Sequence, residues 1–261
     1  MSQDRTPVLE MRGMNKAYGG LRAVINADLE LYPGEVLAIV GNNGAGKSTL
    51  IKLLTGVERA DSGVVLLDGQ EMQIVDRRSS IDAGIEAVYQ NLGLVDTLPA
   101  PANVFLGDEP VRRILGIPFI DNRRMRKETD RILRERVGVK LPNLDAPVQA
   151  FSGGQRQAVA IARAIYHTDL KVLVMDEPTA ALGPEETQAT LELIRSVRDR
   201  GIGVILICHN LEDVFAVADR VMVMRGGRRV GVVEVPNSSR REVLGMIIGS
   251  ERGPVHADAM A

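Results

Sequence analysis

The sequence is poor in aromatic side chains and in cysteine. Its 261 residues include no tryptophan, four tyrosines, four phenylalanines and a single cysteine, Cys208. One cysteine excludes a disulfide within the chain and fits a reducing compartment such as the cytosol. Because aromatics are scarce, the hydrophobic residues are mostly aliphatic, which is typical of buried parallel strands packed against helices. We therefore expect a cytoplasmic α/β protein.

Long hydrophobic runs and a large net charge are also missing. The longest apolar runs, such as residues 204–208, have only the length of a strand, far below the ~20 residues of a membrane-spanning helix. Residues 1–7 lack the apolar core of a signal peptide. The formal net charge is −2, so the overall charge favours neither nucleic acid nor an anionic membrane as a partner. If this protein works at a membrane, we expect it to dock on another chain that spans it.

A glycine-rich loop follows the apolar run 36–40, which predicts a buried strand, and precedes a predicted helix. The loop consists of Gly41, Asn42, Asn43, Gly44, Ala45, Gly46, Lys47, Ser48 and Thr49. Its glycines let backbone N–H groups converge on phosphate oxygens, and the helix start points further N–H groups at the same anion. Lys47 would then reach the β- and γ-phosphates, and the Ser48 hydroxyl would bind Mg²⁺. The alternative is a flexible glycine turn, but the four fixed positions would recur by chance in only roughly one chain of this length per hundred, and the preceding strand pattern makes that alternative weaker still.

Two adjacent carboxylates end a second predicted strand. The run 171–175 leads directly into Asp176 and Glu177. Ligands of open α/β sheets bind at the carboxyl ends of the strands, where these side chains would lie. Asp176 can hold Mg²⁺ through its water shell, and Glu177 can orient and deprotonate an attacking water. The alternative is an ordinary surface pair.

Three single residues are weaker candidates. Gln90 directly follows the predicted strand 85–89, where its amide can reach a metal or a water. His209 directly follows the predicted strand 203–208, where it can contact a terminal phosphate. Tyr18 lies beside two glycines on a predicted antiparallel flap, where it can stack on a nucleotide base. Each position also suits plain packing or a solvated loop.

A second phosphate-ready helix start occurs later in the chain. Its residues are Ser152, Gly153, Gly154 and Gln155, which combine a hydroxyl and two glycines before an apolar helix face. The same tetrad also makes an ordinary N-cap and turn, so the motif is weak when it is taken alone.

The segment between these motifs has a different composition. Six prolines occur between residues 91 and 150, and the periodic stretch 123–137 predicts a helix. Its basic cluster, residues 123–127, is matched by nearby acids, which favours a solvated helix face over a nucleic-acid patch. We expect one domain over 1–250, with a core formed by 1–90 and 151–250, a mostly helical subdomain at about 91–150, and a frayed tail at 251–261.

In order and spacing, these pieces resemble the ATP-binding subunit of ABC transporters over about residues 8–235. More narrowly, four segments look like the bacterial simple-sugar importers of the ribose, xylose and fructose type: residues 87–92, 103–107, 179–183 and 209–210. The resemblance implies a P-loop NTPase (RecA-like) α/β core with an antiparallel β flap and a mostly helical insertion. It also implies that the chain hydrolyses ATP with Mg²⁺.

The resemblance assigns a role to each matching residue. Residues 41–49 become the Walker A loop, and residues 152–155 become the signature motif, which in this family contacts the ATP held by the opposite subunit. The remaining roles are Walker B acid for Asp176, catalytic base for Glu177, metal and water contact for Gln90, switch histidine for His209 and adenine-stacking residue for Tyr18.

The resemblance also implies partners. Only one glycine loop is present, whereas these importers often fuse two ATPase units, so the chain would pair with a second copy or with a related ATPase subunit. A membrane permease and, indirectly, a solute-binding protein would complete the assembly at the cytoplasmic face of the inner membrane, with no nucleic acid. Gly183 departs from the family pattern, because many members have Asp in this interface loop.

Two alternatives remain for the function. One is a soluble ABC ATPase that acts on a ribosome or on DNA, although such proteins usually carry tandem units, coiled coils or basic extensions. The other is a nucleotide-gated regulatory module with little turnover.

Overall fold

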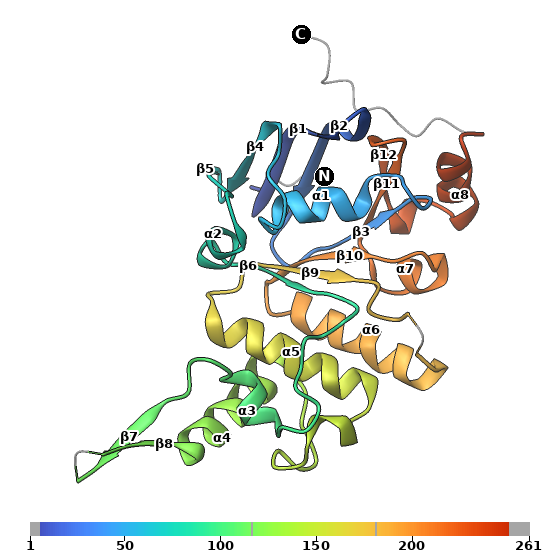
Figure 1. The fold of residues 1–261 in the computed structure, drawn as a ribbon. Coiled ribbons are helices and arrows are strands. Elements are labelled where there is room, and N and C mark those ends of the chain that lie inside the picture. Colours follow the sequence, from blue (N-terminus) through green and yellow to red (C-terminus); the bar gives the residue numbers. More distant parts are fainter. Residues whose placement is uncertain (1–5, 116, 181, 251–261) are drawn as a thin grey trace.

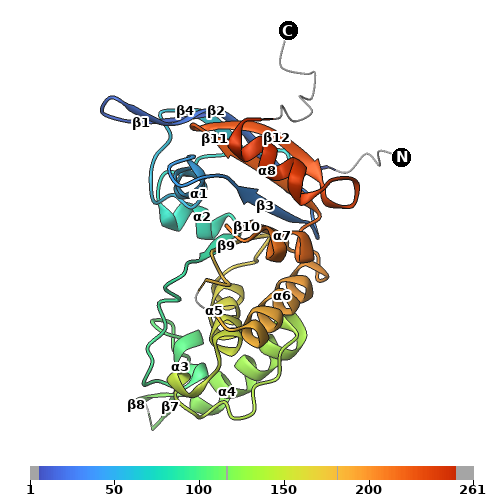
Figure 2. The same cartoon turned by 90° about the vertical axis from the view of Figure 1, so that its right-hand side faces the viewer.

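The computed structural model describes residues 6–115, 117–180 and 182–250. A four-stranded and a six-stranded β-sheet are stacked with helix α1 (Lys47–Leu54) between them, and the longest helices cover the outer face of the six-stranded sheet (Figure 1). The view in Figure 2 shows the same layers from the side. One hydrophobic core fills the space between the two sheets, and a second lies beneath the longest helices.

The central sheet has six strands, whose bounds are β3 Val36–Val40, β6 Ile85–Val88, β9 Val172–Asp176, β10 Gly203–Ile207, β11 Arg220–Arg225 and β12 Arg228–Glu234. They lie in the order β12-β11-β3-β10-β9-β6. All neighbours are parallel except the hairpin of β11 and β12. Every residue of β3 and β10 is buried, as expected for aliphatic strands covered on both faces. Because β3, β6, β9 and β10 run in one direction, the segments that follow them leave from the same edge of the sheet.

The second sheet is the antiparallel flap. It contains β1 (Leu9–Tyr18), β2 (Leu21–Leu31), β4 (Ser62–Leu67) and β5 (Gln70–Met72) in the order β2-β1-β4-β5. The predicted flap is confirmed, with its turn at residues 19 and 20. The sequence did not predict that β4 and β5 join it.

Helices cover both faces of the central sheet. The bounds of those that do so are α2 Arg77–Asp82, α5 Gly153–His167, α6 Pro184–Arg198, α7 Leu211–Val217 and α8 Arg240–Ile248. Helix α5 begins at the predicted residue, because the Ser152 side chain caps it.

Residues 91–150 form a separate layer beyond α5. This segment contains α3 (Ala100–Val104), α4 (Asn122–Arg131), a π-helical turn (Ile132–Val137) and a 3₁₀ turn (Val148–Ala150). The predicted helix at 123–137 is therefore confirmed as α4 and the π-helical turn. An antiparallel hairpin, β7 (Val111–Ile114) and β8 (Ile117–Ile120), projects from this layer and was not predicted (Figure 1).

Within the described ranges, no helix combines the length and the apolar character that crossing a membrane requires. The predicted frayed tail, residues 251–261, lies outside the described part of the chain, as does residue 181 of the 179–183 segment.

Candidate functional site

The glycine loop joins the buried strand β3 to the start of α1. Gly46 is the N-cap of α1 with φ of 99°, and no side chain caps this helix. The Ala45 N–H donates to the Asn42 carbonyl at 3.0 Å, and the Lys47 ammonium donates to the carbonyls of Gly41 at 2.7 Å and Asn42 at 3.1 Å. The loop therefore folds around its own lysine and leaves the helix start open to an anion.

The shape of the loop depends on glycine at specific positions. A Cβ atom on Gly46 would collide with the carbonyl oxygen of Ala23 on β2, and one on Gly41 would collide with that of Met224 on β11. A Cβ atom on Gly44 would meet nothing within 4 Å. The loop is thus packed tightly against both sheets on one side and has free space at Gly44, which fits a bound polyphosphate.

Gly46→Ala and Gly44→Ala form a matched pair of variants. Both add a methyl group at positive φ, which costs about 1–2 kcal/mol. Only Gly46→Ala also overlaps the Ala23 carbonyl, so we expect about 1–3 kcal/mol of further destabilisation. Urea unfolding of the two variants measures the difference, and equal losses would show that the loop does not pack against β2 as described.

The carboxylates of Asp176 and Glu177 lie near enough to Lys47 for their charges to interact. Asp176 ends β9 and is partly buried. Burial raises the pKa of Asp176, the neighbouring Glu177 raises it further, and Lys47 opposes both effects. Burial lowers the pKa of Lys47, and the charges of Glu177 and Asp176 oppose that shift. The glycine loop and the end of β9 thus bring one cation and two carboxylates together at the sheet edge.

Glu177 is held in an unusual backbone conformation. Its φ is 50°, in the left-handed region that disfavours residues other than glycine. Its N–H donates to the Ile207 carbonyl at 2.9 Å, and its carbonyl accepts from Ala180 N–H at 3.1 Å. These bonds turn the chain sharply after β9. The carboxylate then lies 3.5 Å from the Nδ1 atom of His209, which follows β10.

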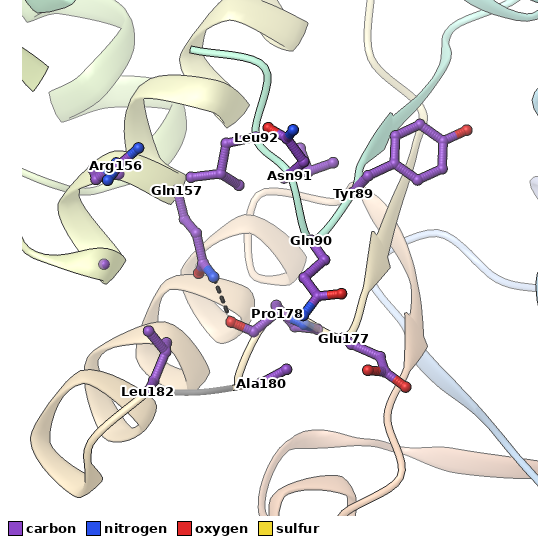
Figure 3. A pocket seen from close by; sticks show the side chains of 12 residues that line it. Tyr89, Gln90, Asn91, Leu92, Arg156, Gln157, Glu177, Pro178, Ala180 and Leu182 are labelled. Carbon is purple, nitrogen blue, oxygen red and sulfur yellow. Dashed lines mark hydrogen bonds between the residues drawn. The ribbon is translucent and has the colours of Figure 1, made fainter. Parts of the chain in front are cut away.

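Gln90 shares a cavity with Glu177. The cavity has a volume of about 360 Å³ and is lined by β6, the segment after it, the start of α5 and the residues after β9. Figure 3 shows the Gln90 side chain directed toward Pro178 and Glu177. Gln90 and Glu177 thus line one cavity, and Glu177 also lies beside His209, although the three residues follow different strands.

Gln157 connects α5 to the same turn. This side chain is only 5% exposed, and its amide Nε2 donates to the carbonyl of Pro178, directly after Glu177 (Figure 3). Beyond the turn, the Thr179 hydroxyl donates to the buried Asp213 carboxylate at 2.8 Å. The sequence analysis did not single out these bonds. The one feature of the sequence that could have indicated them is a glutamine, Gln157, on the apolar face of the helix that begins at residue 153.

Gln157→Leu should weaken both stability and turnover. The variant leaves the Pro178 carbonyl without its buried donor, which costs about 1–3 kcal/mol. Since Pro178 holds the turn at Glu177, we expect turnover of the bound substrate to fall by up to ~10²-fold. Gln188→Leu, on the exposed face of α6, is the control and should stay within about 0.5 kcal/mol. An unchanged urea midpoint together with unchanged turnover would contradict this role.

The second phosphate-ready helix start lies at the far side of the cavity. Ser152 Oγ accepts from the Gln155 N–H at 3.4 Å, and Gln155 Oε1 accepts from the Ser152 N–H at 3.1 Å. The Gly153 N–H donates to Glu186 Oε1 at 3.2 Å. Of this tetrad, only Gly153 lines the cavity with Glu177, and Ser152, Gly154 and Gln155 do not.

The remaining predicted residues lie on exposed parts of the site. Tyr18 ends β1 with 41% of its surface exposed, and its ring lies 5.4 Å from the Lys16 ammonium. Asn42, Asn43 and Ser48 are exposed on the loop, and Thr49 is half-buried. In residues 6–115, 117–180 and 182–250, no cluster of three or more His, Cys, Asp or Glu side chains is arranged to hold a metal ion.

Comparison with known proteins adds independent information. Residues 24–180 match the ABC transporter family. The chain is 42% identical to the fructose import ATP-binding protein FrcA of Rhizobium meliloti, and the match covers 97% of this chain and 98% of that protein. It is 41% identical to the ribose import ATP-binding protein RbsA of Chromobacterium violaceum, and here the match covers 93% of this chain but only 47% of RbsA.

A solved structure shows the same fold. The ADP conformation of MJ1267, an ATP-binding cassette of an ABC transporter, superposes with a TM-score of 0.78. The sequence identity is 26%, and the superposition covers 93% of this chain and 99% of that one. The predicted fold is confirmed by this likeness.

Proposed function

Because the chain belongs to the ABC transporter family, whose ATP-binding cassettes hydrolyse ATP, we propose that it is the motor subunit of a sugar importer. The two similar proteins import fructose and ribose, which supports a sugar as the transported solute. The alternative function, action on a ribosome or on DNA, has no comparable support.

The observation that carries the proposal is that the glycine loop with Lys47 follows β3 and the carboxylates of Asp176 and Glu177 lie at the end of β9, at the same edge of the parallel sheet and close enough for their charges to interact. Lys47 and the open N–H groups of α1 can bind the phosphates of ATP. The Glu177 carboxylate, turned by its backbone conformation, can take a proton from the attacking water, and His209 and Gln90 can position that water and the terminal phosphate. Tyr18 can stack on the adenine.

Mg²⁺ fits the same place. Mg²⁺ is commonly held by one or two carboxylates together with substrate phosphates and waters, so a cage of protein ligands is not needed. Ser48, Asp176 and Gln90 supply a hydroxyl, a carboxylate and an amide oxygen, which are hard oxygen donors of the kind this ion prefers. The bound ion would neutralise charge that develops on the phosphate oxygens.

A second copy of the chain, or a related ATPase subunit, would complete the site. Ser152, Gly154 and Gln155 do not line the cavity that contains Glu177 of the same protomer. Their helix start carries two glycines, and the positive end of the helix dipole favours an anion there, although Glu186 and Ser152 now hold the N–H groups of Gly153 and Gln155. We propose that it contacts the ATP held by the partner's glycine loop. The greater length of RbsA, of which this chain matches 47%, fits a protein with two such units in one polypeptide.

Transmission to a membrane permease can pass through Gln90. A second cavity, of about 440 Å³, lies between α2, the segment after β6 and α5. It shares residues 88, 89, 91 and 92 with the cavity at Glu177. A permease segment seated in the second cavity would contact the same stretch of chain that carries Gln90. We propose that this couples ATP turnover to import at the cytoplasmic face of the inner membrane, with a solute-binding protein delivering the sugar outside.

Co-purification tests this function. Expressed with its permease and solubilised in mild detergent, the chain should co-purify with a membrane protein, and its ATP hydrolysis should rise when the solute-loaded binding protein is added. ATP hydrolysis by a chain that captures no permease, or that instead captures ribosomal proteins or DNA, would favour the alternative function.

A further inference from the structure

The β7–β8 hairpin exposes an unusual amount of apolar surface. All eight residues of its two strands are exposed. Leu115, at the tip, is 99% exposed. Five further apolar side chains are at least 45% exposed, namely Val111, Ile114, Ile117, Phe119 and Ile120. Exposed apolar groups of this density mark an interaction site in a stable protein.

The apolar side chains occupy both faces of the hairpin. Val111 pairs with Ile120, and Ile114 pairs with Ile117. Because successive side chains of a strand point to opposite faces, Val111 and Ile114 lie on different faces. A flat protein surface can cover only one face of a ribbon, whereas the acyl and headgroup region of a lipid layer surrounds an inserted ribbon on all sides. This two-sided pattern therefore favours lipid over a flat protein partner.

The charges around the hairpin favour an anionic lipid. The formal net charge of the whole chain is −2, but residues 111–127 contain six Arg and Lys side chains and one acid, Asp121. Acids resume at Glu128 and Asp130, and Arg126 pairs with Asp145, so the excess positive charge is greatest on the hairpin, where residues 111–120 include no acid. Arg112 and Arg113 belong to the hairpin itself, and the other four lie in α4, whose start adjoins the hairpin through the bond from Asp121 N–H to the Pro110 carbonyl at 2.7 Å. Long basic side chains at an apolar surface extend their charges toward the headgroups.

The size of the hairpin fits shallow insertion. Four residues per strand, at ~3.3 Å each, reach roughly 13 Å. That length is comparable to the depth to which interfacial segments enter a bilayer, and it is far below the ~30 Å of the hydrocarbon core. Figure 1 shows the hairpin projecting away from both sheets, so insertion would not obstruct the ATP site.

We propose that the β7–β8 hairpin is a lipid anchor that inserts its apolar tip into an anionic bilayer surface. Arg112, Arg113 and the basic start of α4 bind the lipid phosphates, and Leu115 enters the acyl boundary. The inference rests on one part of the proposed function, namely that the chain works beside a membrane. It goes beyond that function by proposing a direct contact between the chain and the lipid.

The absence of tryptophan makes a direct test possible. Phe119→Trp places the only tryptophan of the full chain on the hairpin. With vesicles that contain phosphatidylglycerol, its emission should shift to shorter wavelength and be quenched by brominated acyl chains. Vesicles of phosphatidylcholine alone should give a much smaller shift. Leu244→Trp, at a 47% exposed leucine on α8, is the matched control and should not respond.

Co-sedimentation with the same vesicles measures affinity. Replacing Leu115 and Ile117 by serine exchanges two exposed apolar side chains for small polar ones, and the affinity for vesicles should fall at least tenfold. Replacing Arg112 and Arg113 by glutamine should weaken binding to anionic vesicles by roughly 30-fold. Leu244→Ser with Ile248→Ser should stay within about twofold of the unmodified protein.

Three results would overturn the proposal. These are an unshifted emission of the Phe119→Trp variant with anionic vesicles, equal vesicle affinity for the hairpin variants and the unmodified chain, and a shift that depends on protein concentration without vesicles. The last result would indicate pairing between copies. The second result would indicate a protein partner instead if the hairpin variants also lost permease capture. ATP hydrolysis measured without vesicles tests the proposed function separately.

Discussion

Glu177→Gln should leave a protein that binds ATP but hydrolyses it about 10²–10⁴-fold more slowly. The substitution keeps the size of the side chain and removes the carboxylate that can accept a proton from water, and general-base catalysis contributes a factor of this size. Binding should change little, because in our proposal the glycine loop, which follows another strand, holds the phosphates. Single-turnover phosphate release and equilibrium ATP binding measure the two effects separately.

The same variant should also trap a dimer. If ATP is contacted by the glycine loop of one copy and the Ser152 helix start of the other, unhydrolysed ATP keeps the copies together. Size-exclusion chromatography with ATP and Mg²⁺ should show a dimer for Glu177→Gln and mostly monomer for the unmodified chain. Glu185→Gln, at an exposed glutamate in the first turn of α6, is the control for loss of one negative charge. Normal turnover by Glu177→Gln would remove this residue from the role of base.

Lys47→Ala should lose affinity for ATP by about tenfold to 100-fold. Hydrogen bonds to charged groups contribute about 1.5–3 kcal/mol, and tenfold in affinity corresponds to ~1.4 kcal/mol. The loss has a second cause in this structure, because the charge of Lys47 interacts with Asp176 and Glu177, and for Asp176 its effect is larger than that of Lys52. Without Lys47, the phosphates of ATP would approach two carboxylates that are less well compensated. Titration with a fluorescent ATP analogue measures the change.

The stability of the ATP-free chain should respond differently. Burial lowers the pKa of Lys47, which means that the folded state disfavours its charge. Removing the side chain therefore relieves desolvation as well as removing the bonds to Gly41 and Asn42, and we expect the two effects nearly to cancel. Lys52→Ala, at an exposed lysine in the last turn of α1, removes the same charge and should retain ATP affinity. Equal ATP binding by Lys47→Ala and Lys52→Ala would contradict our placement of the phosphates.

The central strands could be predicted because their signal is local. Runs such as 36–40 and 203–208 are aliphatic almost throughout, and a strand buried on both faces suits such a run at this length. The helix that begins at Gly153 was also predictable, because a serine N-cap and a glutamine three residues later form a capping box that the structure contains.

The features that escaped prediction depend on contacts between distant segments. Nothing near Gln157 in the sequence indicates that its amide meets the Pro178 carbonyl, because the two residues belong to different elements. The positive φ of Glu177 is likewise imposed by a bond to Ile207 on the neighbouring strand. The β7–β8 hairpin escaped because apolar residues normally indicate burial, whereas here they are exposed.

The order of strands in the central sheet has a consequence for how the protein is made. Strand β3, which carries the glycine loop, lies between β10 and β11, and the Gly227 N–H donates to the Ala45 carbonyl at 3.0 Å. The two neighbours of β3 begin only at Gly203 and Arg220, so the ribosome makes both of them long after residues 36–46. Until then the nascent chain has no neighbour on either side of β3, and the loop cannot adopt its anion-binding shape. Nascent chains that stop before residue 203 should not be retained on immobilised ATP, and those that extend beyond residue 234 should be.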